Sequence, residues 1–197
     1  MKDKYFHRRN LPHLYFNDGI YFITYRLADS LTSDKVAEVK EVIDDRKIED
    51  REKFKRLLKK YDKILDSGLY GKKHLANSVV AEICKHSLHY LDGKDYKLIC
   101  YCIMTNHIHL VFELLKGNRG ISKIMQSIKR TSARKSNLAL KRNGKFWQDE
   151  SYDRLVRDDK ELYFIIKYVL MNPVEAGLVE NWSDWKYTYC RSEYLVL

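Results

Sequence analysis

The 197-residue sequence contains only two prolines and eight glycines, which leaves little room for long flexible linkers. Its four cysteines, Cys84, Cys100, Cys102 and Cys190, form no Cys-x-x-Cys pair and show no regular spacing, so the pattern argues against a disulfide framework and a thiolate zinc site. The longest apolar runs are far shorter than a membrane span, and the N-terminal segment lacks the apolar core of a signal peptide. We therefore expect one domain over residues 1–197, in a reducing cytoplasm and with no membrane partner.

The sequence contains fewer acidic than basic residues. Lys and Arg number 37 against 27 Asp and Glu, which gives a formal net charge of +10. A basic surface favours polyanions such as nucleic acid, anionic lipid or acidic protein. Charge alone does not distinguish a nucleic-acid-binding protein from one that is merely basic and soluble.

Hydrophobic periodicity predicts an α+β protein. Apolar residues form continuous or alternating runs at three predicted strands, residues 20–27, 96–103 and 107–114. Helical spacing predicts helices within 35–66 and 75–91, a basic helix from 121 to about 142, and a helix over 159–171 that Pro173 ends at Asn172. Residues 1–13 are expected to be irregular, and residues 146–156 to be a loop that leads into a strand.

This order of elements favours an antiparallel sheet with helices packed mainly on one face. Residues 96–103 and 107–114 should form a hairpin. The helical segment 35–91 is then inserted between the first and second core strands. The many charged residues between the apolar positions of 35–66 are expected to form a solvated face.

His107 and His109 lie two positions apart in a predicted strand, so their side chains point to the same face of the sheet. Ile108 and Leu110 alternate with them and should pack on the core. Two neutral imidazoles side by side can chelate a divalent metal ion. Taken alone, the pattern is more often a pair of surface histidines on a half-exposed strand.

Tyr168 and Asn172 lie four positions apart in the last predicted helix and therefore share nearly the same face. A phenol and an amide oxygen thus line one edge of the end of that helix. Taken alone, this pair is an ordinary tyrosine at the rim of an amphipathic helix, followed by an Asn-Pro stop.

Together, these motifs resemble those of a known family. The resemblance rests on N-H-I-H at residues 106–109, Y-V-L-M-N-P-V-E-A-G-L at residues 168–178 and F-W-Q at residues 146–148. In this order they are similar to the single-tyrosine HUH transposases, and most closely to the REP-associated tyrosine transposases. The match extends from R-R-N-L-P-H at residues 8–13 to Leu178, which is most of the chain. Thr105 departs from the pattern, because a proline often precedes the Asn-His-x-His motif.

The resemblance implies a ferredoxin-like HUH fold, a Mg²⁺ or Mn²⁺ site, and single-stranded or hairpin DNA as substrate. His107 and His109 match the family's metal ligands, Asn172 its third, amide-type ligand, and Tyr168 its nucleophile. The tyrosine of this family attacks a phosphodiester and forms a 5′-phosphotyrosine. Related proteins work as dimers or as monomers, so the oligomeric state stays open between a monomer and a homodimer. A DNA partner also implies association with the nucleoid.

Cationic side chains are candidates for contacts to DNA phosphates. The basic helix carries Lys123, Lys129, Arg130, Arg134 and Lys135. Further candidates are Arg154 and Arg157 beside the tyrosine helix, Arg8 and Arg9 in a basic N-terminal arm, and Trp147, which can stack on a base or belong to the core. An ordinary solvated basic face is the alternative reading of the helix.

Two other functions remain open at this stage. A related protein could recognise a DNA or RNA hairpin without cutting it, although such a binder has no need of His107, His109, Tyr168 and Asn172. A metal-dependent hydrolase that uses a bound water would cleave DNA without the tyrosine.

Overall fold

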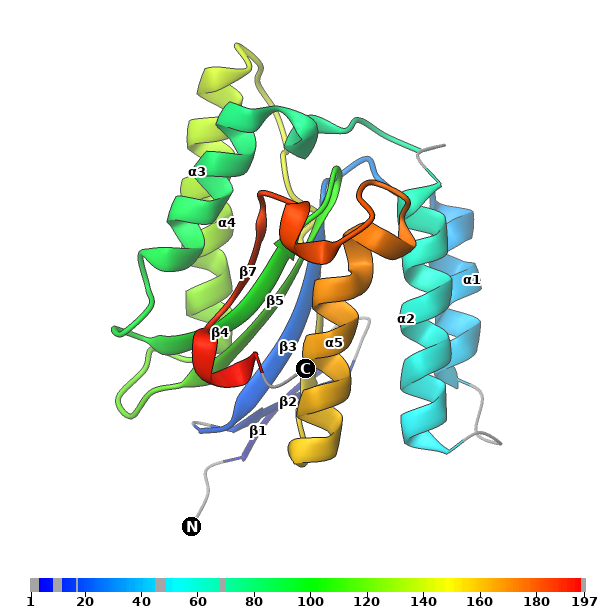
Figure 1. Ribbon diagram of the computed structural model, residues 1–197, viewed down its shortest axis with the longest axis vertical. Coiled ribbons are helices and arrows are strands. Elements are labelled where there is room, and N and C mark those ends of the chain that lie inside the picture. The colour runs from blue at the N-terminus through cyan, green and yellow to red at the C-terminus, as the bar shows by residue number, and fades with distance from the viewer. Residues whose placement is uncertain (1–3, 9–11, 17, 45–48, 68–69, 196–197) are drawn as a thin grey trace.

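The computed structural model describes residues 4–8, 12–16, 18–44, 49–67 and 70–195. Its centre is a five-stranded antiparallel sheet with the strand order β6-β3-β5-β4-β7 (Figure 1). The strands are β3 (Ile20–Arg26), β4 (Tyr96–Ile103), β5 (His107–Leu114), β6 (Tyr152–Leu155) and β7 (Thr188–Cys190). The helices are α1 (Ser33–Asp44), α2 (Asp50–Asp66), α3 (Ser78–His89), α4 (Ile121–Ala139) and α5 (Asp159–Glu175).

The central strand β5 pairs with β4 on one side and with β3 on the other. The three strands are rich in β-branched and aromatic residues, which favour the extended backbone. In the β3–β5 register, Thr24 lies opposite His109 and Arg26 lies opposite His107. Directly opposite residues in an antiparallel pair point to the same face, so these four side chains share one face of the sheet.

The α+β class and the antiparallel sheet confirm the prediction, whereas the placement of the helices differs from it. Helices cover both faces: α3 and α4 pack on one, and α2 and α5 on the other (Figure 1). The reason lies in β4, whose near-continuous apolar run Y-K-L-I-C-Y-C-I buries side chains on both sides. Leu98, Tyr101 and Ile103 belong to the core under α3 and α4, and Ile99 and Cys102 to the core under α5.

Three helices, α1 to α3, lie between the first and second strands of this sheet in chain order, where the sequence placed its helical insertion. None of the helices in the described ranges is long and apolar enough to cross a bilayer.

Two predictions about local structure are wrong. Residues expected to be irregular near the N-terminus form a separate two-stranded antiparallel ribbon of β1 (Lys4–Arg8) and β2 (Pro12–Phe16). Pro12 fits because it is the first residue of its strand. Helix α5 continues past Pro173 to Glu175, since the amide of Ala176 donates to the Asn172 carbonyl at 3.0 Å and closes the last turn.

Candidate active site

The two histidines of β5 are fully buried and face each other. Their Nε2 atoms lie 2.9 Å apart, and their ring centroids are separated by 4.6 Å. Burial lowers the pKa of His107 to about 3 and that of His109 well below its ordinary value, and the neighbouring His107 lowers the latter further. Both rings are therefore neutral at physiological pH, the state in which an imidazole nitrogen can bind a metal ion.

Neighbouring polar groups fix the orientation of both rings. Nδ1 of His107 lies 2.8 Å from Oδ1 of Asn106, whose Nδ2 donates to the carbonyl of Leu65. Nδ1 of His109 lies 2.8 Å from the hydroxyl of Thr24 on β3. When each Nδ1–H donates to these oxygens, each Nε2 lone pair is left free and aimed at the space between the rings.

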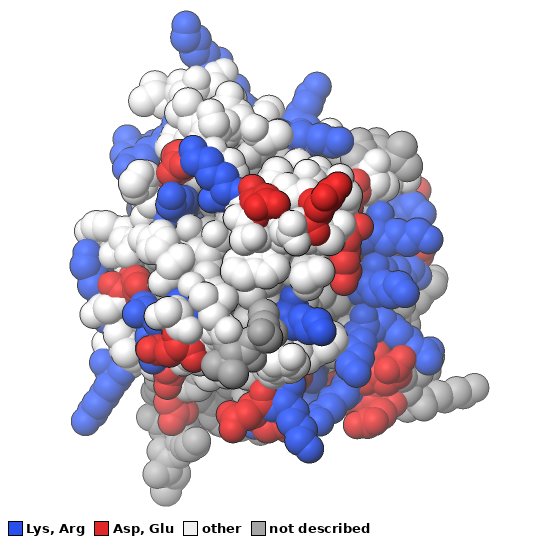
Figure 2. All heavy atoms as spheres, in the orientation of Figure 1, with Lys and Arg blue, Asp and Glu red and all other residues white. Residues whose placement is uncertain are grey.

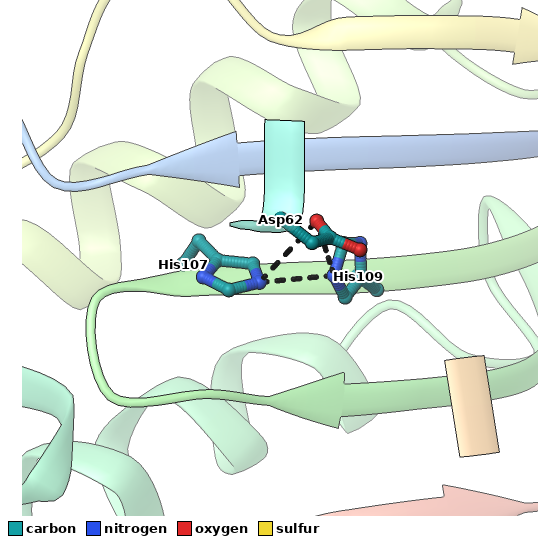
Figure 3. A group of neighbouring side chains, drawn as sticks. All are labelled: Asp62, His107 and His109. Carbon is teal, nitrogen blue, oxygen red and sulfur yellow. Dashed lines mark hydrogen bonds and ion pairs between the residues drawn. The ribbon is translucent and has the colours of Figure 1, made fainter. Parts of the chain in front are cut away.

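Asp62 of α2 completes the group, as Figure 3 shows. Its Oδ1 atom lies 3.5 Å from Nε2 of His109 and 4.0 Å from Nε2 of His107. Burial raises the pKa of the Asp62 carboxyl well above its ordinary value, and the nearby charge of Asp66 raises it further. The ligand atoms of these three residues all lie within 4.8 Å of one another.

Sequence reasoning missed Asp62, because the charged residues of its helix were expected to face solvent. The spacing of residues in the sequence does indicate that Asp62 is buried. Asp62 comes four residues after Leu58 and three before Leu65, both of which belong to the apolar stripe of α2. A lone carboxylate at helical spacing inside an apolar stripe must be buried, and a buried carboxylate needs a partner.

Helix α5 brings Tyr168 and Asn172 to the same place. The Tyr168 hydroxyl donates to Oδ2 of Asp62, and Nδ2 of Asn172 donates to the same oxygen at 3.0 Å. The Tyr168 ring packs edge-on against His109, with centroids 5.3 Å apart, and against Phe22. Tyr168 is half-buried and Asn172 is 1% exposed. The four residues singled out from the sequence thus converge around one carboxylate.

The donor set fits a divalent cation. Two buried side-chain oxygens of the site, Oδ1 of Asp62 and Oδ1 of Asn172, have no hydrogen-bond partner. Buried polar atoms without partners are costly, so their presence beside two imidazole nitrogens suggests a missing positive charge. Two imidazole nitrogens, a carboxylate and an amide oxygen form a mixed nitrogen and oxygen donor set without a thiolate, which a divalent cation can occupy.

The predicted DNA-binding residues of α4 lie away from this site, on the other face of the sheet. Lys123, Lys129, Arg130 and Trp147 line a groove of about 960 Å³ between α4 and residues 144–151. Lys123 and Arg130 are exposed, whereas Lys129 donates to the carbonyls of Gln148 and Asp149. Arg134 and Lys135 are exposed on α4 but do not line the groove.

The other candidates are held in ion pairs, packed in the core or not described by the structure. The side chain of Arg154 is 11% exposed and pairs with Glu161 and Asp50, and Arg157 pairs with Asp50. Trp147 is 5% exposed and packs in the core, where its Nε1 donates to the Ser132 hydroxyl at 2.9 Å. Arg8 belongs to β1 and its side chain is not described, while Arg9 lies outside the described residues.

The face that carries α2 and α5 has mixed charge. Figure 2 shows cationic side chains gathered over α2 at the right of the view, with acidic side chains among and beside them. This face therefore does not present a uniform basic surface.

A five-stranded antiparallel sheet that carries paired histidines on its central strand, faced by a helical tyrosine, defines a protein of the HUH tyrosine transposase class. The family described as "Transposase IS200 like" matches residues 50–172, and the chain belongs to this family. The matched segment runs from the start of α2 to Asn172 and so contains every residue of the site.

Relatives and a solved structure agree with this family. The chain is 28% identical over 120 residues to a protein of Haemophilus influenzae described as a REP-associated tyrosine transposase, covering 56% of this chain and 64% of that protein. It is 22% identical over 95 residues to the REP-associated tyrosine transposase of Escherichia coli K12, covering 48% and 54%. The chain thus matches less than two thirds of the length of either relative.

The solved structure of a REP-associated tyrosine transposase bound to a REP hairpin matches with a TM-score of 0.57 at 17% identity. The match covers 92% of this chain and 80% of that one. At this identity, the likeness establishes the shared fold.

Proposed function

We propose that the protein is a metal-dependent, single-strand-specific DNA endonuclease and strand transferase that uses Tyr168 as its nucleophile. The observation that carries this proposal is the convergence of Tyr168, His107, His109 and Asn172 around Asp62. A helix-borne phenol beside a buried cation site places a nucleophile next to a group that can neutralise phosphate charge, which favours attack on a phosphodiester.

The metal ion would be held by Nε2 of His107, Nε2 of His109 and an oxygen of Asp62, with Oδ1 of Asn172 as a further ligand. When bound, a divalent cation of this kind neutralises charge on a phosphate and polarises its oxygens. The residues of the protein supply the fixed geometry, because both imidazoles and the carboxylate are buried and held by hydrogen bonds or packing.

Tyr168 performs the displacement. Its phenolic oxygen forms a bond to phosphorus, and the bond between phosphorus and the 3′ oxygen of the preceding nucleotide breaks. The products are a 5′-phosphotyrosine and a free 3′-hydroxyl, which takes up the proton that the phenol gives up. Because the phosphodiester energy is conserved in the adduct, the reverse step with another 3′-hydroxyl joins two strands without a nucleotide cofactor.

Packing prepares Tyr168 for this role. The edge-on contacts with His109 and Phe22 hold the ring, and the hydrogen bond to Asp62 holds the hydroxyl next to the cation site. Holding a nucleophile in position beside its target removes much of the entropic cost of the reaction.

We further propose hairpin-bearing DNA as the substrate. A protein of the same fold has been solved with a REP hairpin, and the groove beside α4 offers Lys123, Arg130 and Lys129 to a polyanion. Phosphate contacts of this kind supply affinity without sequence specificity.

The deciding experiment is incubation with hairpin-bearing single-stranded oligonucleotides and Mn²⁺ or Mg²⁺. We expect a covalent protein–DNA adduct that survives denaturing electrophoresis, and we expect Tyr168→Phe to abolish it. The matched control is Tyr163→Phe, because Tyr163 is a half-exposed tyrosine of the same helix that touches none of the site residues by any described contact.

Three outcomes would contradict the proposal. Adducts that persist in Tyr168→Phe would assign the nucleophile to another residue, and cleavage without any adduct would point to hydrolysis by a bound water. Tight hairpin binding with no cleavage under either metal ion would instead favour a protein that recognises the hairpin without cutting it.

A further inference from the structure

Arg26 is the last residue of β3 and lies directly opposite His107 in the sheet register. The two side chains therefore share the face of the sheet that carries the candidate site. None of the roles discussed so far uses this arginine.

Among the residues that the structure describes, the buried guanidinium of Arg26 has no countercharge. Arg26 is 6% exposed, and its Nη1 donates weakly to the Leu27 carbonyl at 3.4 Å and to the Ser30 hydroxyl at 3.3 Å. Tyr61 is a further neutral neighbour, since burial raises the pKa of its phenol and the charge of Arg26 opposes that rise. Within the described part of the chain, no ion pair joins Arg26 to a carboxylate.

This state is unusual for a buried arginine, which cannot lose its charge. Arg154 shows the ordinary solution: its side chain is similarly buried, and Glu161 and Asp50 neutralise it. A buried cation that lacks such a partner costs stability, so an anion supplied from outside the chain would relieve the cost.

A place for that anion exists. Arg26 and Tyr61 line a cavity of about 80 Å³ under α1 and α2, together with Gln148, Ser151 and Tyr152. The cavity is well below the roughly 300–1,000 Å³ of pockets that enclose whole ligands, so it has room for one small group. Val36, Val39, Leu57 and Leu58 make the rest of its wall apolar, so Arg26 is the cation that an anion would meet there. Glu150 also lines it, so a bound anion must lie nearer to Arg26 than to that carboxylate.

The cavity borders both regions that DNA would contact. Gln148, Glu150 and Ser151 line it and also line the groove beside α4. Arg26 itself lies opposite His107 in the β3–β5 register, which brings the cavity close to the candidate site. Since His107, His109 and Tyr168 do not line the cavity, a group bound there is not the phosphate that Tyr168 attacks.

We propose that Arg26 binds a backbone phosphate of the substrate strand next to the phosphate at the Tyr168 site. The arginine is a positioning residue: it holds the strand between the α4 groove and the candidate site. The guanidinium presents two parallel N–H donors to phosphate oxygens, which gives orientation as well as charge. This inference rests on the proposed function, in that it takes a DNA strand as the substrate.

The test measures binding of a fluorescently labelled oligothymidylate of about 15 nucleotides in EDTA, over a range of salt concentrations. We expect Arg26→Met to weaken binding about tenfold and to reduce the slope of log affinity against log salt by about 0.7, the value for one single-strand phosphate contact. Arg26→Lys should restore the slope, because it keeps the charge, and only part of the affinity, because it loses the planar fork.

The matched control is Arg119→Met. Arg119 follows the end of β5 that is farther from His107, and it pairs with Asp95. Its substitution by Met removes the same charge from the protein as Arg26→Met does. Its salt slope should equal that of the wild type. An equal loss of slope in both variants would show a general charge effect and would overturn the proposal.

Folding is separated from binding by a second readout. Because Arg26 has no carboxylate partner in the described part of the chain, we expect Arg26→Met to melt at or above the temperature of the wild type. A variant that melts lower and binds the oligonucleotide with unchanged affinity and slope would give Arg26 a structural role and refute phosphate binding.

The metal-free binding assay also separates this inference from the proposed function. Suppose that the wild-type protein forms no adduct, while Arg26→Met lowers the salt slope of binding by the value for one phosphate contact. That result would refute the endonuclease proposal and support phosphate binding by Arg26. Where adducts form, we expect Arg26→Met to raise the DNA concentration for half-maximal rate about tenfold, with the saturated rate within about twofold. A change in the saturated rate alone would overturn the assignment as a positioning residue.

Discussion

At the scale of single residues, the carboxylate of Asp62 is buried and has contrasting neighbours on its two oxygens. One of its oxygens accepts hydrogen bonds from Tyr168 and Asn172, and the other faces two imidazole nitrogens without a hydrogen bond. The carboxylate therefore links the tyrosine of α5 to the histidines of β5. A buried carboxylate with these neighbours is costly unless a cation shares its charge.

Replacing Asp62 with Asn should separate metal binding from folding. We expect Asp62→Asn to lower Mn²⁺ affinity by at least about tenfold, because the only charged ligand of the site is lost. Isothermal titration calorimetry measures the affinity, and thermal melting without metal should show no loss of stability, since a buried charge has been removed.

Asp66→Asn is the matched control for this variant. Asp66 lies one turn later on α2 and its substitution removes the same charge, but it is not part of the ligand group. We expect its Mn²⁺ affinity to stay within about threefold of the wild type. Unchanged affinity in Asp62→Asn would remove Asp62 from the ligand set.

The residues of the site differ in how far the sequence could predict them. His107, His109, Tyr168 and Asn172 belong to short motifs, and the structure brings all four together. Asp62 comes from a helix in which charged residues are abundant, so the sequence pattern did not distinguish it from acidic residues that face solvent. Arg26 ends an apolar strand, and only the β3–β5 register places it beside His107.

Lys129 gives a pH dependence outside the metal site. Burial lowers the pKa of its ammonium to about 8, an effect that Asp149 and Asp153 oppose and that Arg26 and Lys145 reinforce. The ammonium binds phosphate only while it is protonated. We therefore expect oligothymidylate affinity to fall as the pH rises through about 8, where an ordinary lysine with a pKa near 10.4 stays charged.

Lys129→Arg should abolish that fall, because a guanidinium keeps its charge across the range. Fluorescence anisotropy in EDTA at several pH values measures it. The stability of the fold has the opposite pH dependence. Because the unfolded chain keeps this proton to higher pH, raising the pH from about 8 to about 10.4 removes the free-energy cost of burying the charged ammonium. An affinity that is flat with pH in the wild type would show that Lys129 makes no phosphate contact.

At the scale of elements, α2 determines whether the site is complete. The sheet supplies the histidines and α5 supplies the phenol and the amide, but the carboxylate comes from α2. Phe54 and Leu58 of α2 pack into the same apolar cluster as Val169 of α5 and Val111 of β5. The position of Asp62 therefore depends on the apolar contacts of its own helix.

Truncation of Leu58 should weaken both the fold and the metal site. Leu58 is 2% exposed and lies one helical turn before Asp62. We expect Leu58→Ala to reduce the free energy of unfolding by about 2–5 kcal/mol and to weaken Mn²⁺ binding as α2 loosens. Denaturant unfolding and calorimetry measure the two effects.

Lys59→Ala is the matched control, because Lys59 is the exposed neighbour on the same helix. It should change stability by no more than about 0.5 kcal/mol. If Leu58→Ala lost stability but bound Mn²⁺ as the wild type does, the carboxylate would be positioned by something other than the packing of α2.

At the scale of the whole molecule, the two regions proposed to meet DNA lie on opposite faces of one sheet. The α4 groove belongs to the face under α3 and α4, and the candidate site to the face under α2 and α5. Of the two edges of the sheet, the one formed by β6 and residues 148–151 borders both the groove and the Arg26 cavity, so we expect a strand that contacts both faces to pass there.

This path predicts which cationic side chains of α4 contact DNA phosphates. Lys123 and Arg130 are exposed and line the groove, whereas Arg134 and Lys135 are equally exposed on the same helix and do not. We expect a Lys123→Gln, Arg130→Gln double variant to reduce the salt slope of oligothymidylate binding by about 1.4, the sum for two single-strand phosphate contacts. Arg134→Gln with Lys135→Gln removes the same charge and should change the slope by less than half as much. A larger change in the second pair would move the strand to the outer side of α4, and the edge at residues 148–151 would then no longer connect the groove with the candidate site.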